Sequence, residues 1–324
     1  MIVVTGATGF IGSAMVWELN QNGLTDILCV DTIAPNDRPQ PLSGKSYKEF
    51  QSAEEFRQSV LNTSDRMNVD VIFHMGACSN TAEMNKSYLA DNNTQYTKDL
   101  FTFCAQHDIP FIYASSGAVY GEGEHGFSDT TDPTEFTPLN PYGESKLNFD
   151  IWVLKETKTP SHWYGLRFFN VYGPNEYHKR DMCSVVFKAF NQINESQQLK
   201  LFKSHNPDYK DGEQMRDFVY IKDITRWMWE LYQKQKAQSG IYNLGFGEAR
   251  TWLDLAKATF LNMGKDLKID WIDIPSHLRE QYQYYTKADI SKLTKQGLST
   301  PQWPLEKGIA DYVKNYLLKS DPTL

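Results

Sequence analysis

Short apolar runs alternate with segments of helical spacing through the first half of the chain. The apolar runs predict strands at residues 2–5, 26–31, 71–74, 111–114 and 164–168, and the helical spacing predicts helices that include 11–20, 101–106 and 142–154. Short, continuously apolar strands separated by helices indicate a parallel sheet that is covered on both faces. The first half therefore predicts an α/β fold with a doubly wound parallel sheet of the dinucleotide-binding, Rossmann type.

The alternation weakens after about residue 170. Turn-rich pieces, one helical pattern and one apolar run follow, at residues 172–174, 206–212, 224–233 and 241–244. We therefore predict a dinucleotide-binding domain over residues 1–170, which later segments at about 216–240 re-enter. Residues 171–324 are predicted to form a smaller substrate-binding domain.

The composition is that of an ordinary globular protein. Of the 324 residues, 40% are hydrophobic and 23% are charged. The 33 Lys and Arg residues against 40 Asp and Glu residues give a net charge of −7, and no long run of one sign occurs. This balance argues against a nucleic-acid partner and against an anionic-membrane surface, while a local basic pocket for a phosphorylated ligand stays compatible with it.

The sequence predicts neither a membrane span nor a secretion signal. No apolar stretch reaches about 18 residues, and the first residues run directly into a strand and a glycine turn. The cysteines show neither a Cys-x-x-Cys spacing nor a metal-site pattern, so we expect no bound metal and a reducing, cytoplasmic compartment. They are Cys29, Cys78, Cys104 and Cys183.

Three glycines follow the first predicted strand and open the first predicted helix. They are Gly6, Gly9 and Gly12. Glycine permits a tight turn, a close approach of backbone N–H groups to a pyrophosphate, and close packing of the helix on the strand. The helix N-terminus then supplies donors and a favourable dipole to the anion. This context predicts that the turn binds a dinucleotide.

Asp31 ends the second predicted strand, where an acidic residue binds the ribose hydroxyls of NAD. A nearby cation would instead favour the 2′-phosphate of NADP, and Arg38 lies in the proline-rich loop that follows. A single loop arginine is commonly just solvated. These residues by themselves therefore favour neither NAD nor NADP clearly as the cofactor.

Tyr142 and Lys146 lie four residues apart, on one face of a predicted helix. An ammonium group near a phenol stabilises the phenolate and lowers its pKa, so that the tyrosine can exchange a proton with a substrate hydroxyl near neutral pH. Ser116 follows the fourth predicted strand, whose carboxyl end faces the ligand crevice. Its hydroxyl can bind the reacting oxygen, or it can simply satisfy the loop backbone.

Further motifs follow one another in order along nearly the whole chain. Together they resemble the extended short-chain dehydrogenases/reductases, and within these the nucleotide-sugar epimerases that act at C6 of ADP-L-glycero-D-manno-heptose. The segment ending at Ser79 and the pair His178-Lys179 are the most discriminating. The motifs are His74-Met-Gly-Ala-Cys-Ser79, Asp91-Asn92-Asn-Thr-Gln-Tyr96, Phe169-Asn170-Val-Tyr-Gly-Pro174, His178-Lys179, Met215-Arg216-Asp-Phe-Val-Tyr220, Ile241-Tyr-Asn-Leu-Gly245 and Gln281-Tyr282-Gln283.

The resemblance implies a tightly held NADP that is regenerated in each cycle. It thereby favours NADP over NAD, because Arg38 stands where the family has a basic residue. The residues that would bind the cofactor, beside the three glycines, are Phe10, Ile11, Asp31, Thr32, Arg38, Met75, Gly76, Ala77, Cys78, Ser79, Asn92, Lys146, Val171 and Lys179.

The resemblance also implies a set of substrate-binding residues. They are Ser116, Asn170, Asp181, Lys188, Phe202, Arg216 and Tyr282. Three features depart from some family members: Asp181 and Lys188 stand where serine and histidine occur elsewhere, residues 204–214 form a longer stretch, and Ala53 stands where a lysine sometimes faces the cofactor. These departures concern the sugar and adenosine pockets and leave the reaction type unchanged.

Inversion at C6 requires a hydride to leave one face of the carbon and return to the other through a transient ketone, so each face needs a proton-transfer group. We assign Tyr142 to one face and Lys179 to the other. Lys179 can alternatively bind phosphate or form a solvated basic turn with its neighbours. Arg216 is expected to grip the ADP pyrophosphate bidentately, or else to pair with Asp217 or another acidic residue.

Three other functions compete with this prediction. A UDP-hexose 4-epimerase would share Ser116, Tyr142 and Lys146. A sugar 4,6-dehydratase needs an acidic pair after the serine, where Gly117 and Ala118 stand. A non-catalytic NADP-binding protein would not require Ser116, Tyr142 and Lys146 together, so their presence argues against that function. The family further implies a homo-oligomer, commonly a pentamer.

Overall fold

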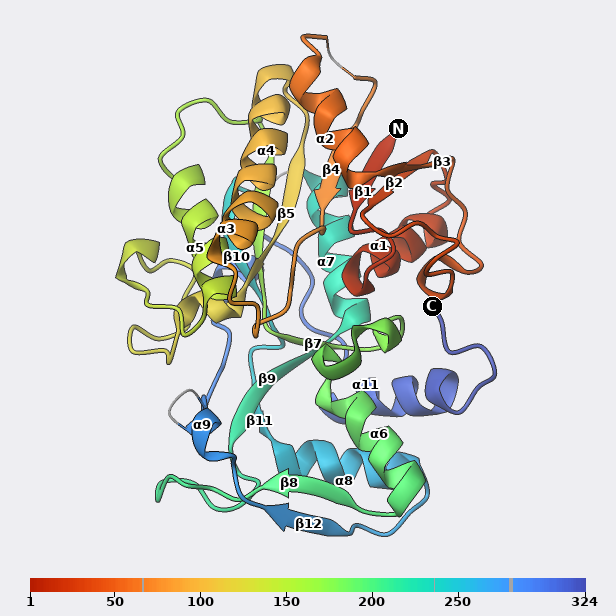
Figure 1. The fold of residues 1–324 in the computed structure, drawn as a ribbon, viewed down its shortest axis with the longest axis vertical. Helices are drawn as coiled ribbons and strands as arrows, with labels where there is room; N and C mark the ends of the chain where they lie inside the picture. The colour runs from red at the N-terminus through yellow and green to blue at the C-terminus, as the bar shows by residue number, and fades with distance from the viewer. Residues whose placement is uncertain (66, 236, 280–281) are drawn as a thin grey trace.

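The computed structural model of the chain describes residues 1–65, 67–235, 237–279 and 282–324. Gln281 of the last motif therefore lies outside the described residues. A seven-stranded parallel sheet forms the larger, upper part of the molecule in Figure 1. Its strand order is β10-β6-β5-β4-β1-β2-β3. The strands are β1 (Ile2–Thr5), β2 (Ile27–Asp31), β3 (Glu49–Ser52), β4 (Val71–His74), β5 (Phe111–Ser116), β6 (Trp163–Phe168) and β10 (Gly240–Leu244).

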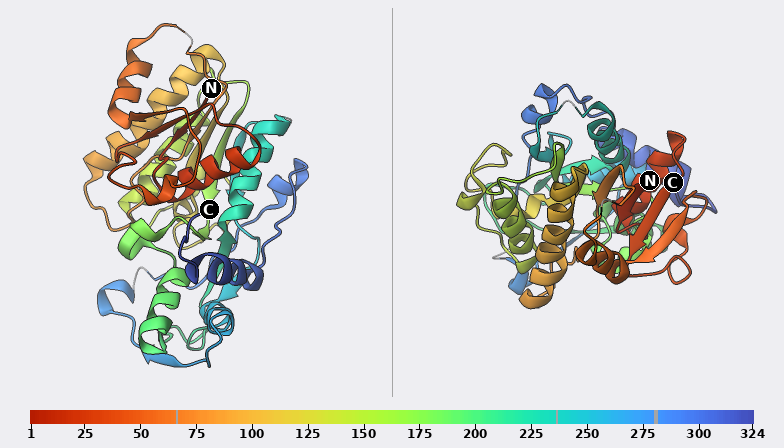
Figure 2. Two further views of the ribbon diagram at one scale, coloured as in Figure 1. Left: turned by 90° about the vertical axis from the view of Figure 1, so that its right-hand side faces the viewer. Right: turned by 90° about the horizontal axis from the view of Figure 1, so that it is seen from above.

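Helices cover both faces of this sheet, as the sequence predicted (Figure 2). Alternate residues of one strand enter different cores: Val4 belongs to the core under α1 (Phe10–Gln21) and α7 (Ile221–Lys234), and Val3 to the core on the other face. Continuous apolar strands result, because neither face meets water. The helices of the second face are α2 (Ala53–Asn62), α4 (Tyr96–His107) and α5 (Pro141–Val153).

One strand of the sheet was not predicted from the sequence. β3 (Glu49–Ser52) is the edge strand beside β2, and its residues are only partly buried or exposed. The segment reads Glu-Phe-Gln-Ser, without an apolar run. Its strand conformation follows from the parallel pairing of Leu28 with Glu49 through Asp31 with Ser52. An edge position that lacks burial leaves no periodic signal in the sequence.

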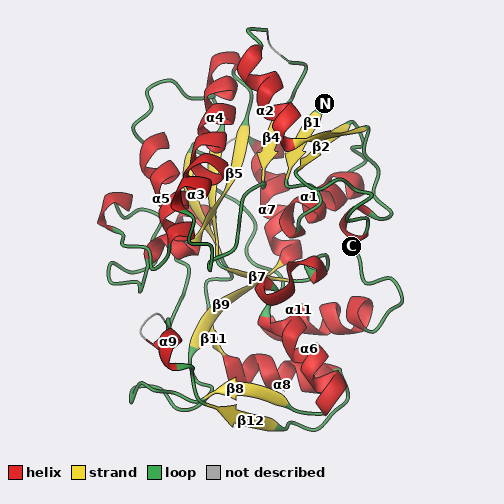
Figure 3. Cartoon of the chain, viewed as in Figure 1, coloured by secondary structure: helices red, strands yellow, loops and turns green. Residues whose placement is uncertain are grey.

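The second half of the chain returns to the large sheet. α7 packs against α1, and β10 pairs in parallel with β6. The remaining elements form the lower part of Figures 1 and 3, around a three-stranded sheet in the order β11-β9-β7 and the parallel pair β12-β8. The strands are β7 (Asn170–Tyr172), β8 (Leu199–Phe202), β9 (Met215–Tyr220), β11 (Ala249–Thr251) and β12 (Ile269–Ile272).

Short and peripheral helices complete the fold. Among the described residues, no helix combines the length and the apolar character that crossing a membrane requires. The π-helices are η2 (Ala90–Gln95) and η6 (Val313–Leu317); the 3₁₀ helices are η1 (Gln40–Leu42), η3 (Gly117–Tyr120), η4 (Pro133–Glu135) and η5 (Tyr177–Met182); and the α-helices are α3 (Lys86–Leu89), α6 (Val185–Ser196), α8 (Trp252–Asn262), α9 (Ser276–Arg279), α10 (Ser291–Lys295) and α11 (Leu305–Tyr312).

Candidate active site

A cavity of about 670 Å³ opens at the carboxyl ends of the strands around β1. The strand order reverses between β1 and β4, and such a switch point is where doubly wound sheets bind ligands. Every residue predicted to bind the cofactor lines this cavity, and so do Ser116, Tyr142 and Asn170. Residues far apart in the sequence thus meet here, and Ala53 lies among them.

The glycine turn between β1 and α1 is shaped to hold a diphosphate. Gly6 has φ +65°, and a Cβ on it would lie 2.7 Å from the backbone nitrogen of Gly76. Gly9 precedes α1 and offers no side chain to cap the helix, whereas Ser52 caps α2 and Asn140 caps α5. The backbone N–H groups at the N-terminus of α1 therefore lack a side-chain acceptor. They face a turn in which a residue larger than glycine would clash with the backbone. These features fit a dinucleotide cofactor.

Replacing Gly12 with alanine is expected to destabilise the protein and to abolish tight cofactor binding. The new Cβ would lie 2.0 Å from the carbonyl oxygen of Gly6, so the turn itself must move. Such overpacking costs about 1–3 kcal/mol. Urea unfolding and cofactor titration measure the two effects. Gly23→Asn is the control, because Gly23 has open space around it and asparagine tolerates its φ of +77°. Equal behaviour of both variants would refute the tight cradle.

A hydrogen-bond network fixes the segment at residues 75–79. The backbone N–H of Gly76 donates to Thr5 Oγ1 at 3.0 Å, and Thr5 Oγ1 is 2.7 Å from His74 Nδ1. The side chain of Asn93 accepts from the Cys78 N–H at 2.8 Å and donates to the Cys78 carbonyl at 3.0 Å. Sequence analysis missed Thr5 and Asn93. Asn92 and Asn93 are adjacent residues of the same type. The sequence therefore does not show that Asn92 lines the cavity while Asn93 supports the segment that lines it.

Asp31 and Arg38 lie at the β2 end of the cavity. The Asp31 carboxylate accepts hydrogen bonds from three backbone N–H groups, those of Thr8 at 3.0 Å, Thr32 at 2.7 Å and Ile33 at 3.3 Å. Arg38 donates to the Thr8 carbonyl at 3.4 Å. The described residues give this guanidinium no carboxylate partner within ion-pair distance, so its charge is available to a ligand.

Ser116, Tyr142 and Lys146 meet where β5 and α5 come together. Ser116 Oγ accepts from the Ala118 N–H at 3.1 Å and is also hydrogen-bonded to the Tyr142 hydroxyl. Ser116 therefore satisfies the loop backbone, as one sequence-based reading expected, and its role at the reacting oxygen stays a prediction. Lys146 Nζ donates to the Ala114 carbonyl at 2.8 Å.

The electrostatics of Tyr142 differ from the sequence-based expectation. Burial raises the pKa of the Tyr142 phenol, and the hydrogen bond with Ser116 only partly opposes this rise. Burial also lowers the pKa of Lys146 to about 8, against the opposing effect of Asp150. The expected lowering of the phenol pKa is wrong for this structure, because burial is the largest influence on it and raises it.

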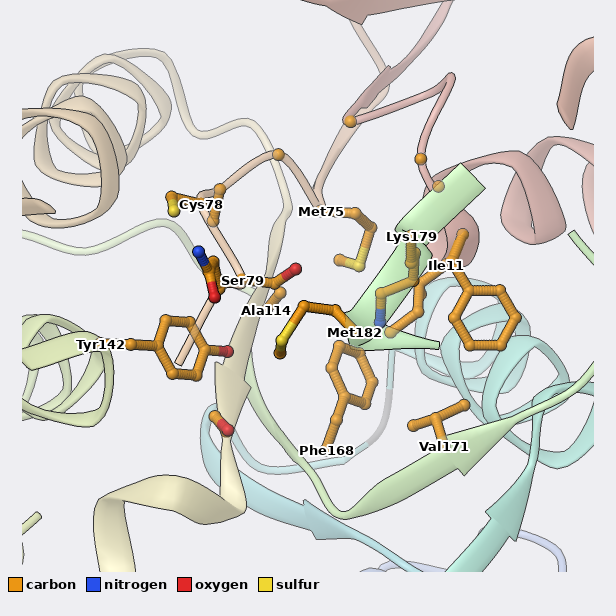
Figure 4. A pocket seen from close by; sticks show the side chains of 18 of the residues that line it. Ile11, Met75, Cys78, Ser79, Ala114, Tyr142, Phe168, Val171, Lys179 and Met182 are labelled. Carbon is orange, nitrogen blue, oxygen red and sulfur yellow. The ribbon is translucent and has the colours of Figure 1, made fainter. Parts of the chain in front are cut away.

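Lys179 approaches the cavity from the other side. Figure 4 shows Tyr142 and Lys179 on opposite sides of the space, with Met182 and Phe168 between them. Lys179 Nζ lies 5.5 Å from the centre of the Phe10 ring. Burial lowers the pKa of the Lys179 ammonium group, while the carboxylate of Glu176 acts in the opposite direction. Met182 and Phe168 were not predicted, since an apolar residue carries no chemical signature.

The loop that carries Lys179 is held from several directions. Glu176 is fully buried and accepts from the Gly173 N–H, the Ser184 hydroxyl and the Tyr312 hydroxyl. Asn175 (φ +79°) and Arg180 (φ +50°) flank the lysine with positive φ angles, which are uncommon outside glycine. Such backbone strain persists only where surrounding contacts impose it.

Five predicted substrate residues do not line this cavity. Asp181 and Lys188 contact each other, through a hydrogen bond of 2.6 Å from Lys188 Nζ to the Asp181 carbonyl. Three others lie in the lower part of the molecule, where the Arg216 guanidinium carbon is 5.5 Å from the Tyr282 ring centre and the rings of Phe202 and Tyr282 are 6.1 Å apart. The structure therefore groups Phe202, Arg216 and Tyr282 with one another, outside the lining of the cavity that holds Ser116, Tyr142 and Lys146.

Arg216 is buried and donates to the carbonyls of Met215 (2.8 Å) and Gln283. Within the described part of the chain it forms no ion pair, and Asp217 instead accepts from the backbone of Phe246, Gly247 and Ala288. The alternative pairing of Arg216 with Asp217 is therefore wrong. Trp252 connects the two regions, because it lines the cavity and lies 5.6 Å from the guanidinium. Sequence analysis did not select Trp252.

Comparison with known proteins agrees with this geometry. Residues 2–245 match the model of the NAD dependent epimerase/dehydratase family, and they include the glycine turn, Tyr142, Lys146 and Lys179. The chain belongs to this family. The matched residues include all seven strands of the large sheet, because β10, the last of these strands along the chain, ends at Leu244. Members of the epimerase/dehydratase family bind a nicotinamide cofactor, as the family's description states.

Individual family members are similar over their whole length. The chain is 44% identical to ADP-L-glycero-D-manno-heptose-6-epimerase of Fusobacterium nucleatum subsp. nucleatum, and the similarity covers 100% of both chains. The crystal structure of the Helicobacter pylori ADP-L-glycero-D-manno-heptose-6-epimerase superposes with a TM-score of 0.80 at 27% identity, covering 97% of this chain and 95% of that one. UDP-glucose 4-epimerase of Thermotoga maritima superposes with a TM-score of 0.76 at 25% identity, with coverage of 95% and 96%.

Proposed function

We propose that the chain interconverts ADP-D-glycero-D-manno-heptose and ADP-L-glycero-D-manno-heptose by inverting C6 through a transient ketone, with NADP as its tightly bound cofactor. The product would supply heptose for the core of lipopolysaccharide. The observation that carries the proposal is that Tyr142 and Lys179, to which we assign proton transfer, lie on opposite sides of one cavity beside the glycine turn. The full-length identity to named heptose epimerases supports the substrate class.

The chain's own residues then divide the work of inversion. The glycine turn and the residues that line the cavity around it would hold the nicotinamide cofactor, which would supply the hydride acceptor and donor that inversion of the sugar carbon requires. Tyr142 exchanges the proton of the C6 hydroxyl on one face, and Ser116 holds that oxygen. Lys179 exchanges the proton on the other face after the ketone has turned. Phe168 and Met182 line the space between them and limit the access of water.

Two groups of residues are proposed to bind the rest of the substrate. Asn170 lines the cavity and is assigned to the sugar. Arg216, framed by Phe202 and Tyr282, is assigned to the ADP moiety, because a buried guanidinium without a carboxylate partner in the described structure matches phosphate oxygens. Asp181, in η5, and Lys188, in α6, stay assigned to the substrate by resemblance to the family.

The β2 end of the cavity supports the proposal of NADP over NAD. The Asp31 carboxylate accepts from three backbone donors, and the Arg38 guanidinium, which donates to the Thr8 carbonyl, has no carboxylate partner among the described residues. That combination favours a 2′-phosphate. The proposal also includes a cytoplasmic compartment and a homo-oligomer, a pentamer by resemblance to the family. The division at residue 170 stays a prediction.

Proton NMR of the purified protein with ADP-D-glycero-β-D-manno-heptose, without added cofactor, tests the proposal. Conversion to the L-glycero epimer would establish the reaction and show that the protein carries its cofactor. Failure even with added NADP would reject it. The second candidate, a UDP-hexose 4-epimerase, draws on the similar Thermotoga maritima structure. Isothermal titration with ADP and UDP distinguishes the two, because only the heptose epimerase should prefer ADP.

A further inference from the structure

The segment 320–324 follows η6 and returns from the lower part of the molecule to the large sheet, beside α1 (Figures 1 and 2). There it forms hydrogen bonds with the turn that leads into η5. The Tyr177 hydroxyl donates to the Pro322 carbonyl at 2.5 Å. The Leu324 N–H donates to Asn175 Oδ1 at 3.0 Å. The segment therefore contacts the chain directly before the lysine to which we assign proton transfer.

Asn175 connects this segment to the wall of the cavity. Its side chain is buried, and its Nδ2 donates to Ser13 Oγ at 3.1 Å. Ser13 Oγ in turn donates to the Phe10 carbonyl at 3.1 Å. Lys179 Nζ lies 5.5 Å from the centre of the Phe10 ring. A continuous series of hydrogen bonds thus runs from Leu324 to the residue beside which the Lys179 ammonium group lies.

Lys45, in the loop after β2, holds the segment from the side of the large sheet. Its Nζ donates to a main-chain oxygen of Leu324 at 2.8 Å, and the Leu324 side chain packs against the core under α1 and α7. A partly desolvated ammonium group requires such an acceptor. Lys45 does not line the cavity, so its effect on a reaction there would have to pass through the segment.

The segment holds the Lys179 loop on a side that the other contacts of the loop do not cover. Glu176 ties the loop to Ser184 at the start of α6 and to Tyr312 in α11, both in the lower part of the molecule. On the side of α1, the loop is held through Asn175, whose φ of +79° persists only where contacts impose it. Removing Leu324 would leave the buried Asn175 Oδ1 without this donor, which favours a rearrangement of the turn.

We propose that the segment 320–324 acts as a strap that positions Lys179 for proton transfer. It fixes the turn at Asn175 and thereby keeps the ammonium group beside Phe10. This inference rests on the proposed acid–base role of Lys179, and the strap residues act through that lysine without touching a ligand. Because proton transfer requires the exchanging atoms to lie within hydrogen-bonding reach, a displaced ammonium group would lower turnover more than binding.

A variant that lacks residues 320–324 tests the inference with two readouts. In the proton NMR assay, we expect the turnover number to fall about tenfold or more, while the KM for ADP-heptose and the dissociation constant for NADP change less than about twofold. Reductive methylation followed by mass spectrometry reports the position of Lys179 without any turnover. In protein freed of nucleotide, Lys179 should react several-fold faster in the variant, and exposed Lys48 should react at an unchanged rate.

Lys45→Met tests the same strap in a chain of full length, should the truncated chain fail to fold. It removes one contact of the strap, so we expect the turnover number to fall about threefold and the methylation of Lys179 to accelerate. Lys45→Arg should restore turnover, because a guanidinium can donate to the same oxygen. Lys48→Met is the matched control, since this exposed lysine pairs with Asp26 outside the cavity.

The outcomes separate this inference from the proposed function. Turnover numbers of the truncated and Lys45→Met variants within about twofold of the unmodified value would overturn it. Slower turnover with an unchanged methylation rate of Lys179 would overturn it as well, because the segment would then act elsewhere. So would an equal loss of cofactor affinity and turnover, which indicates a general support of the fold. If the unmodified protein does not convert the heptose even with added NADP, the proposed function fails, and methylation alone decides whether the strap holds Lys179.

Discussion

Replacing Tyr142 with phenylalanine is expected to lower the turnover number for heptose epimerisation by about 10²–10⁴-fold, the usual contribution of a positioned acid–base group. The substitution removes only the hydroxyl that is hydrogen-bonded to Ser116 and leaves the ring that lines the cavity. Cofactor affinity should therefore stay within about twofold of normal. Turnover is measured by proton NMR, and cofactor affinity by titration.

Tyr285→Phe is the control for this substitution. Tyr285 also carries a phenol, but it is 38% exposed and lies outside the cavity. It should retain full activity. If Tyr142→Phe kept turnover close to that of the control, a different residue would have to transfer the proton on that face.

Replacing Lys179 with methionine is expected to abolish turnover to a similar extent while the cofactor stays bound. Methionine keeps the length and the apolar stem of the side chain beside the Phe10 ring but cannot exchange a proton. The loss should appear in the turnover number, because one face of the ketone then lacks its proton-transfer group. Single-turnover NMR together with cofactor titration measures the two properties separately.

Arg180→Met is the matched control, since Arg180 lies in the same turn but is exposed and does not line the cavity. Near-normal turnover of the Lys179 variant would eliminate its acid–base role. A variant with a weakened affinity for substrate or cofactor and a normal turnover number would instead identify Lys179 as a phosphate ligand. The two results are distinguishable, because uniform binding and transition-state contributions affect different kinetic constants.

Local sequence patterns predicted the parts of the fold that burial and backbone chemistry dictate. The continuous apolar strands around Val3, Ile72 and Ile112 identified the parallel sheet, because each strand is buried on both faces. The spacing of Gly6, Gly9 and Gly12 predicted a dinucleotide cradle, since only glycine fits beside the backbone of Gly76. The four-residue spacing of Tyr142 and Lys146 was sufficient to select the helix that supplies the phenol.

Tertiary contacts decided what those patterns could not. The edge strand β3 forms through pairing with β2, and its exposed residues carry no periodicity. The pKa of Tyr142 rises because burial outweighs the hydrogen bond with Ser116, and the Lys146 ammonium group donates to the Ala114 carbonyl. A sequence specifies which groups are present, but desolvation and the pairing of charges depend on neighbours that only the folded chain brings together.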